Sequence, residues 1–125
     1  MGIKDYRDLE IWKRSMDLVE AIYEMTRAMP KEEVYGLTAH VRKTSVSIPS
    51  NIAEGFSRWH TKEYRQFLFV ALGSCAELNT QILIAARLKF LDPDKIVAVS
   101  QEIDVVSRMI MALIKKLDQR PATSG

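Results

Sequence analysis

Cysteine, histidine and glycine are scarce in this chain of 125 residues, and each scarcity argues against a class of site. Cys75 is the single cysteine, so no internal disulfide can form, and its place on an apolar helix face is typical of an inert thiol. The two histidines, His40 and His60, belong to no Glu-x-x-His pair that would suit a metal. The five glycines form no phosphate-binding loop of Walker or Rossmann spacing. We therefore expect no enzyme activity, no metal, no cofactor and no small-molecule substrate.

Uninterrupted apolar runs are missing as well. No stretch of membrane-spanning length is free of charge, and the first residues lack the apolar run of a signal peptide. The hydrophobic fraction of 47% and the charged fraction of 27% are typical of a soluble globular protein. We expect one cytoplasmic domain of bacterial type over residues 1–125, without membrane contact.

Strong charge of either sign is also absent. The net charge of +2 is too small to indicate nucleic-acid binding by itself. Its distribution is uneven, because residues 36–65 contain five Lys and Arg against two Asp and Glu. An excess of this size occurs on many solvated surfaces, so it locates a candidate surface without assigning a function to it.

What the chain does have is helical periodicity. Apolar residues recur every three or four positions throughout, a spacing that predicts helices and no sheet. We expect helices at about 8–29, 33–56, 62–90 and 93–118, with a frayed tail at 119–125. Four amphipathic helices with short connections predict an all-α fold, an antiparallel up-and-down four-helix bundle.

The apolar stripes predict which helix faces are buried. In the first helix the main stripe is Leu9, Trp12, Met16, Val19 and Tyr23, widened by Leu18, Ile22 and Met25. In the fourth it is Ile96, Val99, Ile103, Val106, Ile110, Leu113 and Leu117. The third helix is apolar on more than one side, because Phe69, Val70, Ile84 and Ala85 fall outside its main stripe. Such a helix requires a second partner surface, either inside the bundle or on another subunit.

Proline and aspartate give local signals. Asp92 before Pro93 predicts a capped helix start. Pro49 falls inside the second helix and is expected to bend it, with Ser45, Ser47 or Ser50 hydroxyls taking up freed backbone groups.

The second helix also contains polar residues that a plain core helix would not use. Ser47, Asn51, Glu54 and Arg58 are spaced by three or four residues, so they can pair on one face. Such a set can fix the register or the subunit geometry of a bundle, or it can contact a ligand.

Arg58-Trp59-His60-Thr61-Lys62, followed by Tyr64 and Arg65, places aromatic rings among cations at a helix junction. This combination suits stacking on bases while the cations meet phosphates. The alternative is structural: Trp59 covers the end of the bundle, with Arg58 and Arg65 resting on its ring.

The most distinctive segments are Tyr35-Gly36-Leu37-Thr38, Ser47-Ile48 and Asn51-Ile52-Ala53-Glu54-Gly55. On these the chain resembles the 23S rRNA intervening sequence proteins from about Tyr6 to Leu117. The resemblance implies an up-and-down four-helix bundle that forms ring-like homopentamers, in a family whose members are in some cases encoded within insertions in bacterial 23S rRNA genes. The related accessory proteins of diversity-generating retroelements look like the same bundle and pair a basic surface with reverse transcriptase and nucleic acid.

Two functional hypotheses follow. In the first, a non-enzymatic homo-oligomer binds RNA or DNA through a basic surface that comprises Arg42, Lys43, Arg58, Trp59, Lys62 and Arg65. A polar motif organises this surface or a subunit interface, and it consists of Tyr35, Ser47, Asn51 and Glu54. In the second, the bundle is a protein–protein scaffold or accessory subunit without nucleic-acid contact.

Overall fold

The computed structural model describes residues 4–58 and 60–119, and every regular element in these ranges is helical. The long helices are α1 (Glu10–Met25), α2 (Leu37–Phe56), α3 (Thr61–Arg87) and α4 (Pro93–Asp118). The predicted all-α four-helix bundle is thereby confirmed. Trp59 and the tail at 120–125 lie outside the described residues.

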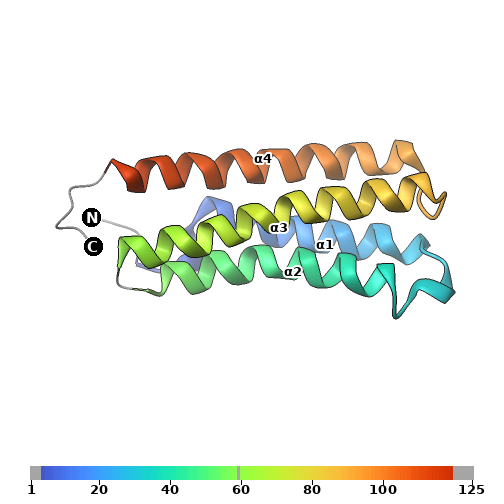
Figure 1. The fold of residues 1–125 in the computed structure, drawn as a ribbon, viewed down its shortest axis with the longest axis horizontal. Coiled ribbons are helices and arrows are strands. Elements are labelled where there is room, and N and C mark those ends of the chain that lie inside the picture. The colour runs from blue at the N-terminus through green and yellow to red at the C-terminus, as the bar shows by residue number, and fades with distance from the viewer. Residues whose placement is uncertain (1–3, 59, 120–125) are drawn as a thin grey trace.

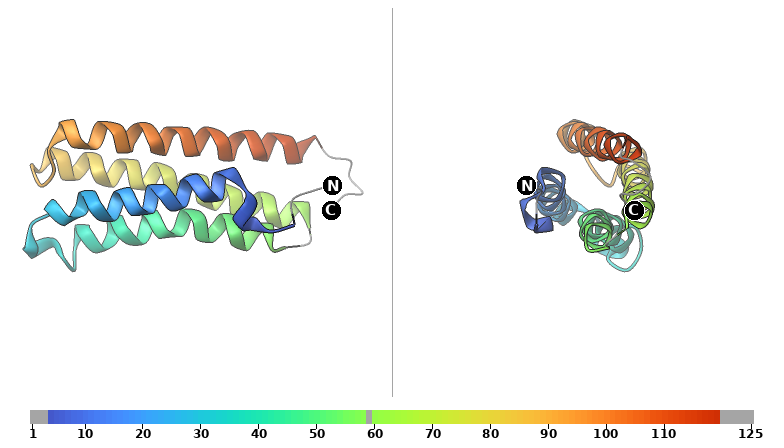
Figure 2. Two further views of the ribbon diagram at one scale, coloured as in Figure 1. Left: turned by 180° about the vertical axis from the view of Figure 1, so that it is seen from behind. Right: turned by 90° about the vertical axis from the view of Figure 1, so that its left-hand side faces the viewer.

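The four helices lie side by side along one long axis (Figure 1). Viewed end-on, α1 and α2 occupy one side of the bundle and α3 and α4 the other (Figure 2). The end of α2, the start of α3 and the end of α4 meet at one extremity, here named the terminal end. The connections from α1 to α2 and from α3 to α4 lie at the other, the loop end.

The helix bounds differ from the predicted ones for identifiable reasons. Asp5 caps a 3₁₀ turn at Tyr6–Asp8, so α1 begins only at Glu10 rather than near residue 8. Gly36 has φ −109° and ψ −116°, outside the helical region, which delays the start of α2 to Leu37. Lys89 has a φ of 63°, a left-handed conformation that ends α3 before the predicted position 90.

The start of α4 agrees with its sequence signal. The Asp92 side chain accepts a hydrogen bond from the Asp94 N–H at 2.9 Å, and Pro93 occupies the first helical position.

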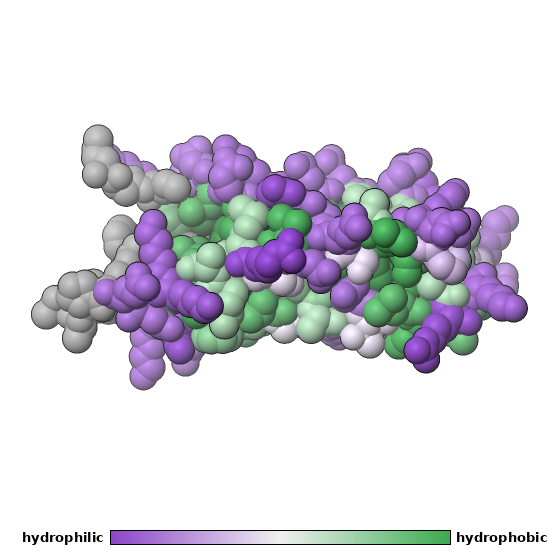
Figure 3. Space-filling view, turned by 90° about the horizontal axis from the view of Figure 1, so that it is seen from above, coloured by the Kyte–Doolittle hydropathy of each residue, from purple (hydrophilic) through white to green (hydrophobic). Residues whose placement is uncertain are grey.

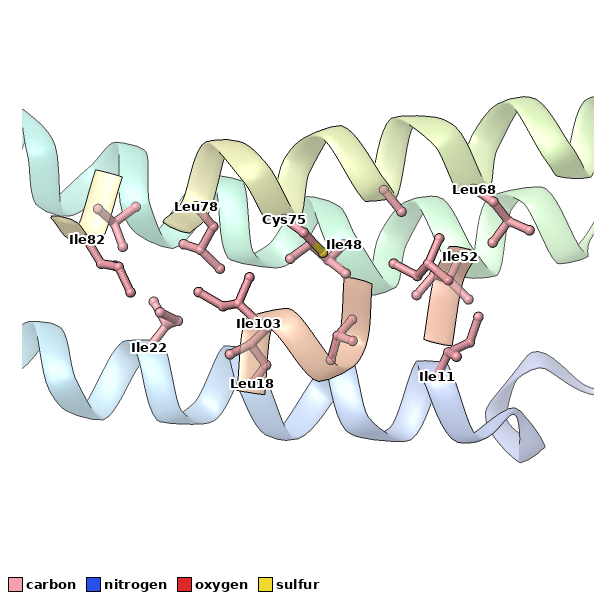
Figure 4. Close-up of a cluster of buried hydrophobic side chains, with 14 of the residues drawn as sticks. Ile11, Leu18, Ile22, Ile48, Ile52, Leu68, Cys75, Leu78, Ile82 and Ile103 are labelled. Carbon is pink, nitrogen blue, oxygen red and sulfur yellow. The ribbon is translucent and has the colours of Figure 1, made fainter. Parts of the chain in front are cut away.

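The core is a column of aliphatic side chains contributed by all four helices (Figure 4). Ile52 of α2 lies near Leu68 of α3 and Ile48 lies near Cys75, and all four side chains are fully buried. The predicted stripe of α4 is largely confirmed, with Ile96, Ile103, Val106, Ile110 and Leu117 buried and Ile114 added.

The predicted core face of the first helix is confirmed only in part: Leu9, Leu18 and Ile22 of the predicted set are buried, but the main stripe is shifted. The side chains buried on α1 are Ile11, Ser15, Leu18 and Ile22, whereas Met16 and Tyr23 are each 41% exposed. The prediction took the stripe that contains Met16 and Tyr23 as the core face. The stripe that packs into the bundle is the neighbouring one, which contains Ile11, Leu18 and Ile22. Apolar surface on α1 therefore remains open toward solvent.

By length and composition alone, one helix among the described residues could span a membrane, namely α3. Core helices of soluble proteins pass the same test, and the stripe that contains Leu78 and Ile82 is buried within the bundle. The expectation of a second apolar side is confirmed, because Val70 is 53% and Ile84 42% exposed. Ala85, predicted to lie outside the main face, is fully buried.

Cys75 lies at the centre of this core with no exposed surface. Burial raises the pKa of its thiol, while a hydrogen bond with Ser107 partly opposes that shift. The neutral thiol is a poor nucleophile. We expect a thiol reagent such as DTNB to leave the native protein unmodified for hours at pH 8 and to label one thiol at once in guanidinium. Rapid labelling of the folded protein would show that Cys75 is accessible.

Candidate nucleic-acid interface

A polar stripe runs along α2, and part of it joins α2 to α3. The Ser47 hydroxyl lies 2.8 Å from the Ser74 hydroxyl of α3 and donates to the Thr44 carbonyl at 2.6 Å. The Asn51 side-chain amide donates to the Ser47 carbonyl at 2.7 Å. The Ser47–Ser74 contact thus joins α2 to α3, whereas the Asn51 bond lies within α2.

The same side-chain bonds surround Pro49. Its ring removes the hydrogen bond to the Ser45 carbonyl, yet the serine hydroxyls donate to neighbouring carbonyls instead: Ser47 to Thr44 and Ser50 to Val46. These hydroxyls therefore donate to backbone carbonyls near the proline. Neither of them donates to the Ser45 carbonyl, which is the group that lost its hydrogen bond.

Arg42 faces α1 and not the basic junction. Its Nε donates to the Thr26 hydroxyl at 2.9 Å, and its guanidinium lies 4.6 Å from the centre of the Tyr23 ring. Sixteen residues of helix separate it from Arg58, about 24 Å at 1.5 Å per residue. Lys43 is exposed but lies nearly as far from the terminal end. The predicted cationic set is therefore split between two regions.

Tyr35, the remaining residue of the polar motif, lies at the loop end, where its side chain is 94% exposed. It takes no part in the contact of Ser47 with Ser74 of α3. The motif therefore consists of separate parts, one at a helix–helix contact and the other on open surface.

Arg58, Lys62 and Arg65 do come together at the terminal end, where α2 stops and α3 begins. Arg58 pairs with Glu54 at 3.0 Å, one turn earlier on α2. Arg65 pairs with Asp118 at the end of α4 at 2.6 Å. Lys62 is exposed and has no ion-pair partner among the described residues.

Both arginines also rest on aromatic rings. The Arg58 guanidinium lies 5.2 Å from the centre of the Phe67 ring, and that of Arg65 lies 4.9 Å from the Phe69 ring. The predicted contacts of these arginines with Trp59 lie outside the described residues. Each arginine has five donors and its ion pair uses only part of them, and both side chains are 44% exposed, so further donors remain at both positions.

The residues before α1 also contribute to this end, although no prediction from the sequence included them. Lys4 and Arg7 lie at the terminal end, where they line a 660 Å³ pocket with Phe56 at the end of α2 and Arg58 just after it. A side-chain hydrogen bond with Tyr6 and the nearby Asp5 carboxylate raise the pKa of Arg7 further above its ordinary value, at which an arginine is already a cation. The sequence signal for this contribution is the placement of Lys4 and Arg7 on either side of Tyr6, just before the first helix.

Carboxylates at the same end moderate its charge. Among the described residues, seven cations lie at this end against five carboxylates, and the seven are Lys4, Arg7, Arg58, Lys62, Arg65, Lys115 and Lys116. The carboxylates are Asp5, Asp8, Glu54, Glu63 and Asp118. One terminal end can thus bind polyanions only weakly, and repeated copies would be needed for tight binding.

Two apolar grooves open on opposite sides of the bundle. The α1/α2 groove, of 330 Å³, includes Tyr6, Trp12, Met16, Val19, Val46 and Pro49. The α3/α4 groove, of 560 Å³, includes Thr80, Leu83, Ile84, Arg87, Pro93 and Ile96. Apolar side chains are also visible among charged ones on the face over α4 (Figure 3). Val97 and Met111 of α4 are exposed. In the described residues no three or more His, Cys, Asp or Glu side chains are grouped to hold a metal ion.

The fold defines the chain as a four-helix-bundle protein with a mixed cationic and aromatic end. The model of the family described as 23S rRNA-intervening sequence protein matches residues 7–112, and the chain belongs to that family. The expected family resemblance is thereby confirmed.

A solved structure gives independent evidence for the fold. It is the crystal structure of a protein of unknown function from the S23 ribosomal protein family of Bacteroides thetaiotaomicron, similar with a TM-score of 0.78 at 13% sequence identity. The similarity covers 84% of this chain and 98% of that one. No curated protein matches the chain.

Proposed function

We propose that this protein is a non-enzymatic, cytoplasmic, homo-oligomeric bundle that binds structured RNA or DNA through its terminal end. The observation that carries this proposal is that one pocket brings Arg58 together with Lys4 and Arg7, which are distant from it in the sequence, at the same end of the bundle as Lys62 and Arg65. Phosphate contacts by such side chains supply most sequence-independent affinity for nucleic acid. The family description, which refers to 23S rRNA, favours RNA as the polyanion to be tested first.

The oligomer supplies what one chain lacks. We propose that the helices form an antiparallel up-and-down bundle and that copies of it associate face to back, the α3/α4 groove of one against α1 and α2 of the next. Unlike surfaces on opposite sides of a subunit generate a ring when the rotation closes. Five copies are what the family resemblance implies, and the ring would repeat each weakly cationic end.

Charge reversal tests the proposed interface. We expect Arg58→Glu/Lys62→Glu to bind a labelled RNA hairpin at least about tenfold more weakly than the wild type at roughly 100 mM salt, because phosphate contacts are replaced by repulsion. Fluorescence anisotropy measures the affinity, and circular dichroism checks the fold.

The matched control is Lys31→Glu/Lys95→Glu, which changes the net charge equally at exposed positions of the loop end. It should bind nearly as the wild type does. Equal weakening by both double variants would mean that only total charge matters, and no weakening by either would rule out the terminal end.

A protein–protein scaffold is the second candidate, favoured by the pairing of Arg58 with Glu54, Arg65 with Asp118 and Arg42 with Thr26. Each pairing gives these cations a structural partner. Absence of RNA and DNA binding by the intact oligomer at low salt would favour this candidate.

A further inference from the structure

The pocket at the terminal end is lined by aromatic side chains as well as cations, and binding of phosphates alone would not require the aromatic ones. It lies between the residues that precede α1 and the end of α2, with a volume of 660 Å³. Ligand pockets of this kind typically measure about 300–1,000 Å³. Its lining includes Tyr6 and Phe56, two aromatic side chains beside cations.

Each of the two rings packs against a second aromatic ring. Tyr6 meets the Trp12 ring edge-on, with ring centres 5.4 Å apart. Phe56 meets the Tyr64 ring edge-on at 5.8 Å. Such contacts fix the orientation of a ring, so a planar ligand would meet a preformed surface.

The cations lie at the rim. Arg7 lies over the Tyr6 ring, 5.0 Å from its centre, and pairs with Asp5 at 3.1 Å. Lys4 is exposed, and Arg58 reaches the pocket from the end of α2. Asp5 and Ser57 complete the lining, so one carboxylate faces three cations.

We infer that this pocket holds one unpaired nucleotide of a bound nucleic acid, with its base against Phe56 and a flanking phosphate among Lys4, Arg7 and Arg58. Bases stack on aromatic side chains and on arginine guanidinium planes, whereas a base within a duplex offers neither face. The inference rests on the proposed function and adds a preference within it: a strand with an unpaired end binds better than a blunt duplex.

The experiment compares two labelled RNA duplexes with equal numbers of phosphates, one blunt and one with a short single-stranded overhang. One stacked base contributes about 1–3 kcal/mol, so the wild type should prefer the overhang by about tenfold. Phe56→Leu should remove most of that preference while it leaves blunt-duplex binding unchanged. Tyr23→Leu, at a half-exposed tyrosine of the loop end, is the control and should keep the preference.

A second variant guards against misfolding, because Phe56 also packs against the core. The Arg7 side chain is exposed, so Arg7→Ala should fold normally and reduce the preference about threefold. Equal affinity of the wild type for both duplexes, with normal salt dependence, would overturn the pocket and leave the proposed function intact. Absence of binding to either duplex would overturn both.

Discussion

Gly55→Ala is expected to destabilise the bundle by about 1–2 kcal/mol net, because overpacking of a tight contact costs about 1–3 kcal/mol. A methyl group built at Gly55 would lie 2.7 Å from Phe67 Cβ and 3.2 Å from the Tyr64 carbonyl oxygen. Both atoms belong to α3, one to a side chain and one to the backbone, so α2 and α3 would have to move apart. The gain in helix propensity from alanine, about 0.5–1 kcal/mol, opposes this cost without removing it.

Gly73→Ala is the matched control. It is the same substitution within α3, but nothing lies within 4 Å of the added methyl group. The variant should be about 0.4–1 kcal/mol more stable than the wild type, since alanine restricts the unfolded chain. Urea unfolding at one protein concentration measures both. Equal destabilisation by the two substitutions would contradict the close approach at Gly55.

Ile84→Glu is expected to dissociate the proposed oligomer into monomers without loss of helix. Ile84 is 42% exposed in the α3/α4 groove, so the single chain tolerates a polar side chain there, whereas a subunit contact would bury the new charge. Sedimentation velocity measures the mass. Ala39→Glu, which adds the same charge at an exposed position of α2, should leave the mass unchanged.

Mixing two variants tests the face-to-back arrangement. Val46→Glu blocks the α1/α2 groove, and Ile84→Glu blocks the α3/α4 groove. Each variant alone should be monomeric, while a mixture should form dimers only, because each dimer retains one intact pair of unlike surfaces. Oligomers of normal mass in Val46→Glu alone would contradict the arrangement.

The sequence predicted the helices well because periodicity and cap residues act locally. Asp92 and Pro93 identified the start of α4, and steps of three and four identified its buried stripe. The stripe of α1 was misassigned because Met16 and Tyr23 are larger and more apolar than Ser15, which is nevertheless buried. Periodicity alone cannot distinguish an apolar stripe that is exposed on the single chain from one that is buried in its core.

The candidate site depended on contacts that are distant in the sequence. Arg58, Lys62 and Arg65 were grouped correctly because they flank one junction. Arg42 was grouped with them although its side chain turns to Thr26 and Tyr23 of the previous helix. Lys4 and Arg7 could be added only when the chain path was known, since 50 residues separate Arg7 from Ser57.

The most direct test of nucleic-acid binding at the terminal end is the salt dependence of RNA-hairpin affinity between about 50 and 200 mM salt. We expect log K to fall steeply with log salt for the wild-type oligomer, and the slope to become shallower by about two units in Arg58→Glu/Lys62→Glu. Identical slopes for the wild type and this variant, or binding that salt does not weaken, would contradict a phosphate-binding role for these residues.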